Sequence, residues 1–232
     1  MRTVLVSIVV LLALLIGADR IALVFAQNQL ADRMQAAGGL TVRPTVSIRG
    51  FPFLTQAFRG TYDRIDAHVL DLTRNGVTLA RLDVTITRAV LPLREIGHAT
   101  SVPVEDLTAT ALVSYLELAH DSRLAGITVT PEGDHVVVTG RITVAGQSVS
   151  ARAISTVALV GQAIKVSAQR VTVLGVGSGL VNRAIRGKLD FTVPIPDLPY
   201  GLRLQRATAG PDGVVLVAAS GRTVLRTTLT QT

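Results

Sequence analysis

The chain is poor in the residues that build reactive and base-stacking sites. Its 232 residues include no cysteine, no tryptophan and few aromatic side chains, namely five Phe and three Tyr. The lack of cysteine excludes disulfides, thiolate catalysis and cysteine-based metal sites. The scarcity of aromatic rings argues against single-strand nucleic-acid binding, which needs stacking platforms among basic residues. We therefore expect no nucleic-acid partner.

The sequence also lacks a catalytic or metal-binding pattern. Its four His residues are scattered, with no pair at metal-ligand spacing. There is no G-x-S-x-G elbow and no H-E-x-x-H motif. The run GVGSGL at 175–180 misses the third glycine spacing of a dinucleotide-binding fingerprint, so we interpret it as a strand-to-helix turn. These absences predict a protein that is not an enzyme and has no metal and no cofactor.

What the chain does have is apolar mass and an uneven charge. Hydrophobic residues make up 48% of the sequence, charged residues only 17%, and the mean hydropathy is +0.46. The net charge is +7, and residues 140–232 hold 11 basic but only 3 acidic residues. Such a positive half favours an anionic partner, for example anionic lipid headgroups. A general solubilising role of the arginines is the alternative.

The amino terminus is typical of an exported protein. Arg2 precedes an unbroken apolar run, Val4–Ala18, which is short for a membrane span of ~20 residues and long for the core of a signal peptide. A peptidase could cut after Ala26, which would make residues 1–26 a signal peptide. Alternatively, Val4–Phe25 remains as a membrane anchor, which we favour because a helical pattern crosses the cut. Both alternatives place the chain in the cell envelope, on the exported side of the cytoplasmic membrane, as an anchored or a periplasmic protein.

After about residue 40 the pattern predicts mainly β-strands. Asn75-Gly76 is a two-residue hairpin signal. The residues that follow alternate between apolar and polar, as in a half-buried strand. Further turns are expected near 145–147, at Gly161-Gln162 and at 211–213, and they separate strands of up to about 12 residues.

Two short helices are expected among these strands. Ser114 with Glu117 forms a capping-box pattern that opens a helix ending near Gly126, and a second helix is expected over Leu180–Lys188. No linker interrupts the chain, so residues 27–232 are predicted to form a single domain. The fold class is α+β, with a long, strongly twisted antiparallel sheet that buries one face on helices, preceded by an N-terminal hydrophobic helix.

Two stretches resemble a known family. VSIRGFPFLTQAFRGTYDRIDAHV, at 46–69, resembles the hallmark of the actinobacterial LmeA family of phospholipid-binding envelope proteins, and Leu198–Gly221 resembles its closing motif. The resemblance covers roughly residues 19–226. It implies phospholipid binding, with phosphatidylinositol-type lipids among the candidates, and a role in the assembly of envelope lipids or lipoglycans. It also implies a fold similar to tubular lipid-binding (TULIP-like) domains, a long sheet curled around a helix.

The candidate lipid-binding residues lie in the first of these stretches, in which three of the five Phe residues are concentrated. Pro52 restrains the backbone, and Phe51 and Phe53 would point to the same side if the segment were extended. Phe58 would lie one helical turn beyond Leu54 if the segment coiled. The five residues could plug one end of the sheet, or they could form an apolar lip where acyl chains enter.

The predicted function is non-enzymatic phospholipid binding at the membrane surface. The expected partners are a phospholipid with an anionic headgroup and the membrane itself, and the sequence names no protein partner. The alternative is a membrane-anchored structural or adaptor protein of the envelope that has a filled core and no bound ligand.

Overall fold

The computed structural model describes residues 2–74, 77–92, 101–121, 127–144, 147–173, 190–195 and 198–226. Its contacts group the chain into two compact units. Unit 1 comprises Met1–Leu70, Asp83–Thr108 and Ser220–Thr232, and unit 2 comprises Asp71–Leu82 and Ala109–Ala219. That residues 27–232 act as one lipid-binding domain stays a prediction.

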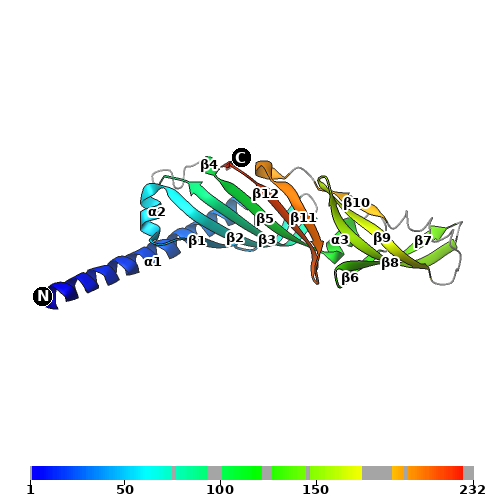
Figure 1. Cartoon of the computed structure of the whole chain (residues 1–232), viewed down its shortest axis with the longest axis horizontal. Helices are drawn as coiled ribbons and strands as arrows, with labels where there is room; N and C mark the ends of the chain where they lie inside the picture. Colours follow the sequence, from blue (N-terminus) through cyan, green and yellow to red (C-terminus); the bar gives the residue numbers. More distant parts are fainter. Residues whose placement is uncertain are drawn as a thin grey trace. The chain divides into compact units, whose positions relative to one another are not determined.

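The described residues form a few helices and many strands (Figure 1). The helices are α1 Arg2–Gly38, α2 Phe53–Arg59, α3 Tyr115–Asp121 and the 3-10 turn η2 Pro199–Gly201. The strands are β1 Thr45–Arg49, β2 Thr61–Arg74, β3 Val77–Val90, β4 Ser101–Val104, β5 Asp106–Ser114, β6 Thr128–Glu132, β7 His135–Val144, β8 Gln147–Val160, β9 Ala163–Val173, β10 Phe191–Pro194, β11 Arg203–Ala209, β12 Gly213–Ser220 and β13 Thr223–Arg226.

The strands form a six-stranded sheet in the order β1-β2-β3-β5-β12-β11, a five-stranded sheet in the order β10-β9-β8-β7-β6, and the pair β13-β4. The pairings β1-β2, β6-β7, β7-β8, β8-β9, β9-β10, β11-β12 and β4-β13 are antiparallel. Among the strands that the structure describes, neither large sheet closes on itself. The predicted antiparallel architecture with a few helices and an N-terminal apolar helix is confirmed at this level.

In unit 1, the second half of α1 packs on one face of the first strands. Ala31 of α1 is buried against Val46 of β1 and Ala67 of β2, which lie opposite each other in the β1-β2 register. Leu30, Met34, Ile65 and Val84 complete this cluster. Side chains alternate between the two faces of a strand, so this apolar set defines the inner face and the charged residues between them form the outer face.

In unit 2, long strands bury one face of the five-stranded sheet. Val136, Val138, Ala153, Ile164 and Val166 are fully buried there, because most inward-facing residues of β7, β8 and β9 are apolar, the buried Ser155 of β8 being an exception. β8 has 14 residues, longer than the sequence suggested. The hydroxyl of Tyr115, at the start of α3, donates a 2.6 Å hydrogen bond to the Gly210 carbonyl and ties α3 to the β11-β12 turn.

Strands end and begin at the predicted turns where the structure describes the residues around them. β2 ends at Arg74 and β3 begins at Val77, as expected for a hairpin, although Asn75 and Gly76 themselves lie outside the described residues. The β11-β12 turn is closed by a hydrogen bond from Gly210 N to Gly213 O, 2.9 Å long. The helix predicted over Leu180–Lys188, the GVGSGL run and Gly126 also lie outside the described residues.

The cap of α3 is only half of the predicted capping box. Ser114 Oγ accepts a hydrogen bond from the backbone N–H of Glu117, at 3.2 Å, as the motif requires. The Glu117 carboxylate, however, accepts from the backbone N–H of Thr78, at 2.9 Å. The side chain that the motif would use locally therefore links α3 to β3 instead.

The N-terminal helix is continuous from Arg2 to Gly38. The helical pattern predicted across Ala26 is thus confirmed. Among the described residues, α1 is the helix that is long and apolar enough to cross a membrane, with a mean hydropathy of 2.5 over its most apolar window. Its apolar residues from Val4 to Ile16 are exposed.

Candidate functional site

The Phe-rich segment forms a short helix with sharply defined ends. β1 stops at Arg49, the Phe51-Pro52 peptide bond is cis, and α2 runs from Phe53 to Arg59. Gly60 ends the helix in the left-handed region, with φ of 67°. A Cβ atom at this glycine would lie 2.7 Å from Pro92 Cα, so only glycine fits here.

The buried Gln56 side chain fastens α2 to the strands on both sides of it. Its Nε2 donates to the Arg49 carbonyl at the end of β1, at 3.2 Å, and its Oε1 accepts from the backbone N–H of Asp63 in β2, at 3.0 Å. Because both polar ends of the amide are satisfied by backbone groups, the helix is held in one orientation.

The apolar side chains of the segment point in two directions, one toward the core and the others toward the surface. The Phe53 side chain is 5% exposed and packs on Tyr62, with ring centroids 6.3 Å apart. Phe51, Leu54 and Phe58 are 64%, 43% and 88% exposed. The condition under which Phe51 and Phe53 would share a side, an extended segment, is not met because α2 begins at Phe53. Phe58 does lie one turn beyond Leu54.

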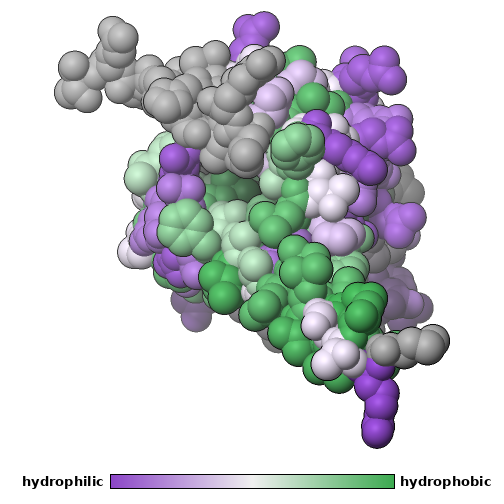
Figure 2. All heavy atoms as spheres, turned by 90° about the vertical axis from the view of Figure 1, so that its left-hand side faces the viewer, coloured by the Kyte–Doolittle hydropathy of each residue, from purple (hydrophilic) through white to green (hydrophobic). Residues whose placement is uncertain are grey.

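Phe51, Leu54 and Phe58 together are called the apolar patch below. Pro52, which precedes the helix, is also exposed. Figure 2 shows the end of the molecule where α1 begins, and apolar side chains gather there over its centre and lower part between hydrophilic side chains. Of the five candidate residues, the structure thus turns four outward and one, Phe53, inward.

Two charged residues of α1 join this helix to α2. Asp19 is 3% exposed. Its carboxylate accepts a 2.8 Å hydrogen bond from the backbone N–H of Leu54 and forms a 2.5 Å ion pair with Arg20. The Arg20 guanidinium carbon lies 5.1 Å from the centroid of the Phe51 ring, a cation–π contact. Sequence reasoning treated these two residues only as the end of the apolar run. A buried carboxylate in an apolar helix needs a partner, and that requirement was the available signal.

A small hollow lies between α1 and the start of β1. It measures about 190 Å³ and is lined by Val24, Gln27, Asn28, Ala31, Arg43, Pro44, Thr45 and Val46. Ligand pockets usually measure roughly 300–1,000 Å³. Arg43 at this hollow is bound to Asp32, at 2.7 Å, and to the Asn28 carbonyl, at 3.1 Å. The hollow is therefore too small for a lipid tail, and its cation is already paired.

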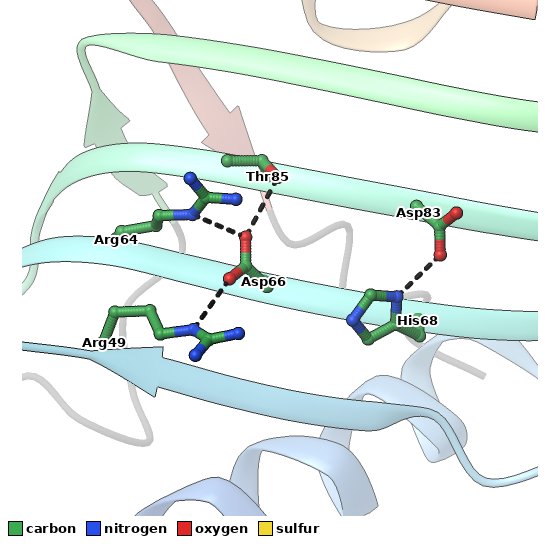
Figure 3. Close-up of polar contacts among 6 residues, drawn as sticks. All are labelled: Arg49, Arg64, Asp66, His68, Asp83 and Thr85. Atoms are coloured by element: carbon green, nitrogen blue, oxygen red, sulfur yellow. Dashed lines mark hydrogen bonds and ion pairs between the residues drawn. The ribbon is translucent and has the colours of Figure 1, made fainter.

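The outer face of β1, β2 and β3 carries a polar network around Asp66 (Figure 3). The Asp66 carboxylate accepts hydrogen bonds from Arg49 at 3.1 Å, from Arg64 at 2.8 Å and from the Thr85 hydroxyl at 2.9 Å. Burial alone would raise the pKa of Asp66, but hydrogen bonds from Arg64, Thr85 and Arg49 outweigh it and hold the pKa below its ordinary value. A carboxylate so fully bound is suited to joining strands rather than to moving protons.

The described part of the chain contains no cluster of three His, Asp or Glu side chains that could hold a metal ion. The nearest approach to a paired set on the outer face is His68 Nδ1 with Asp83 Oδ1, 2.6 Å apart (Figure 3). One imidazole and one carboxylate on neighbouring strands, without a third group, form a cross-strand contact.

Comparison with known proteins identifies the family. No curated protein and no solved structure matches the chain. The family model described as LmeA-like phospholipid-binding matches residues 17–219, which is most of the sequence and includes α1 from its Gly17, the apolar patch and both large sheets. The resemblance inferred from the Phe-rich motif is confirmed: this chain belongs to the LmeA-like phospholipid-binding family.

Proposed function

We propose that the chain binds phospholipid without catalysing a reaction, at the exported side of the cytoplasmic membrane, where α1 holds it. The observation that carries the proposal is the apolar patch. Leu54 and Phe58 project outward from a firmly fixed short helix and Phe51 from the residues just before it, in a chain that has only five Phe, and the family binds phospholipid. Large apolar groups exposed together mark a surface that meets an apolar partner.

The acyl chains are proposed to lie along the inner face of the first strands, in a sheet curled around α1 as in TULIP-like domains. Ile65, Val84 and Ile86 are half-buried, and their alternation with the outer-face residues Asp66 and Thr85 places them on that side. Each buried CH₂ contributes ~0.8 kcal/mol, so a long acyl chain needs no other attraction. In this proposal, Phe53 closes the end of the sheet. Pro52 and the apolar patch form the mouth, the opening through which the acyl chains enter.

The proposed headgroup is anionic, with phosphatidylinositol-type lipids included, and the proposed role is to support envelope lipid or lipoglycan assembly in an actinobacterial cell. Arg59, the last residue of α2, is exposed next to the apolar patch. Arg20, beside Phe51, is exposed as well, with its Nη2 bound to Asp19. Guanidinium groups form bidentate hydrogen bonds with phosphate oxygens, so an anionic headgroup could be held while its tails enter.

One observation favours the alternative, an anchored adaptor protein of the envelope with no ligand. The core of unit 2 is filled by its own side chains. A protein built only on such cores would be purified free of lipid.

The test combines lipid loading with thermal melting of the whole chain purified in mild detergent. We expect native mass spectrometry to find co-purified phospholipid on the wild type. In Phe51→Ala and Phe58→Ala the free energy of unfolding should stay within about 0.5 kcal/mol of the wild type, because these rings are exposed. Both variants should nevertheless carry less lipid. Phe53→Ala should cost ~3–5 kcal/mol because it opens a cavity beside Tyr62.

Leu70→Ala is the matched control, since Leu70 is an exposed apolar residue on the outer face of β2 and should change neither quantity. A wild-type chain free of phospholipid would contradict the proposed function and support the adaptor. Unchanged lipid loading in both Phe51→Ala and Phe58→Ala would remove the apolar patch from the binding site.

A further inference from the structure

The apolar run of α1 is shorter than a bilayer is thick. Val4–Ala18 covers about 22 Å at a rise of 1.5 Å per residue. The hydrocarbon core of a bilayer is ~30 Å thick. If α1 is retained and enters the membrane from Val4, as in the proposed function, the outer boundary of the hydrocarbon lies beyond Asp19, near the exposed Ile21, Val24 and Phe25.

Asp19 therefore lies at the depth of the outer leaflet, where a carboxylate is costly. An unpaired acidic residue at the middle of a membrane helix costs ~2.5–3.5 kcal/mol. In this structure two groups bind the Asp19 carboxylate: the backbone N–H of Leu54, the second residue of α2, and the guanidinium of Arg20. The contact that shields Asp19 also fixes α2 at the level of this residue.

The exposed apolar side chains of α2 and of the residues just before it are suited to contact with lipid. Phe51, Leu54 and Phe58 are exposed, and on α1 the exposed Ile21 and Phe25 continue the apolar surface past Asp19. Arginines stand beside the two exposed rings, with Arg20 over Phe51 and Arg59 next to Phe58. Aromatic residues with neighbouring arginines are typical of the membrane interface, where the ring is buried and the cation reaches the headgroups.

We propose that the apolar patch is seated in the outer leaflet of the same bilayer that α1 crosses, so that α1 and α2 form one membrane-contact unit. The occupant of the exposed apolar surface is then the bilayer itself. The inference rests on the proposed function in requiring a retained α1. It adds that the mouth opens directly into the leaflet, so a phospholipid passes from membrane to protein without crossing water.

The lack of tryptophan and cysteine in the chain allows a clean test. Phe58→Trp and Leu70→Trp each introduce the only tryptophan. The control position is exposed as well and lies in β2, nine residues after Thr61, roughly 30 Å along the strand from α2 at 3.4 Å per residue. Each full-length variant is placed in nanodiscs of ordinary phosphatidylcholine and phosphatidylglycerol, or of the same lipids brominated at a shallow or a deep acyl position.

We expect the emission of Phe58→Trp to shift to the blue in nanodiscs and to be quenched more by shallow than by deep bromine, and Leu70→Trp to show neither effect. Equal emission of Phe58→Trp in brominated and ordinary lipid overturns the inference, as does equal quenching of the two variants. A third arm loads brominated phospholipid and then transfers the chain to detergent. Quenching that persists there undiminished arises from a bound lipid and also overturns seating in the bilayer. Phospholipid loading, measured separately by mass spectrometry, decides the proposed function independently.

Discussion

At the residue scale, Asp66 shows how one carboxylate can join three strands. Arg49 comes from β1, Asp66 and Arg64 from β2, and Thr85 from β3, and all four meet on the outer face. The carboxylate is buried while the two arginines remain largely exposed. Solvent weakens the attraction between charges when one partner is exposed. Hydrogen bonds to the carboxylate therefore provide most of the net stabilisation of ionised Asp66.

The lowered pKa of Asp66 predicts a loss of stability in acid. Since the folded-state pKa lies below the ordinary 3.8, the carboxylate stabilises the fold fully above about pH 4, and this contribution is lost as the pH falls through the folded-state pKa. Asp66→Asn should lower the free energy of unfolding at pH 7 by about 1.5–3 kcal/mol, the contribution of hydrogen bonds to a charged group. The difference from the wild type should shrink below pH 4.

Denaturant unfolding of the full chain in detergent, from pH 7 to pH 2.5, measures this difference. Asp71→Asn is the control, because Asp71 is exposed and its positive φ of 52° suits Asn as well as Asp. A gap between Asp66→Asn and the wild type that stays constant down to pH 2.5 would show that the carboxylate does not contribute through its charge.

At the scale of elements, α1 has two halves with different surroundings. Its first half is exposed and apolar, whereas Ala31, Leu30 and Met34 of the second half pack on the β1-β2 face. Asp19 lies between the halves and contacts α2. Cleavage after Ala26 would remove the Asp19–Leu54 and Arg20–Phe51 contacts and leave the first turn of α2 without its carboxylate partner.

We therefore predict that α1 is retained. The chain isolated from membranes of its native host or a related one should still contain residues 2–26, in a form resistant to salt and alkaline extraction, because an apolar helix is not released by screening of charge. Peptide mapping by mass spectrometry together with N-terminal sequencing makes the measurement. A mature chain that begins at Gln27 would contradict retention and remove the basis for a joint α1–α2 membrane contact.

At the scale of the whole molecule, part of the positive charge of residues 140–232 lies on one face of the five-stranded sheet. Arg141 of β7 and Arg152 of β8 lie on one side of the five-stranded sheet, since Arg141 pairs with Ser150 and Thr139 with Arg152. The β8-β9 register adds Arg170, opposite Ile154, and Lys165, opposite Ala158, to the same exposed face. Within the described residues, Arg152 is the one of these four that forms an ion pair with an acidic side chain, Glu132 at 3.4 Å.

We predict that this face adds a long-range attraction to the preference for anionic lipid that Arg20 and Arg59 are proposed to provide at the mouth. Arg141→Gln, Lys165→Gln and Arg170→Gln combined should weaken uptake of a phosphatidylglycerol-type lipid, by up to about 1 kcal/mol for each charge, and should leave phosphatidylcholine uptake unchanged. In the wild type the preference should fade between 0.1 M and 1 M salt, as the Debye length shrinks from ~10 Å to ~3 Å.

The matched control removes the same charge elsewhere, through Arg203→Gln, Arg206→Gln and Arg222→Gln, all exposed. Lipid uptake by the purified full chain, followed by native mass spectrometry, compares the two triple variants. If both lose the preference equally, net charge alone decides it. If neither loses it, the positive face has no role in headgroup choice.

The sequence by itself determined the features that depend on neighbours along the chain. The apolar run of α1, the alternation of the long strands, the Asn75-Gly76 hairpin and the Ser114 cap are all encoded within a few residues, because helical and strand periods and turn chemistry are local properties. The Phe-rich motif was likewise enough to place the chain in its family.

Only the tertiary structure decided which side chains share a surface. Phe53 turned inward and Phe51 outward because α2 begins between them and is held by Gln56 to two strands. Asp19 accepts a hydrogen bond from Leu54, 35 residues away, and Glu117 accepts one from Thr78, 39 residues away, instead of closing its local cap. Such pairings arise from strand register and from the packing of distant segments. Packing selects the partner that satisfies a buried polar group, and no local pattern in the sequence encodes that choice.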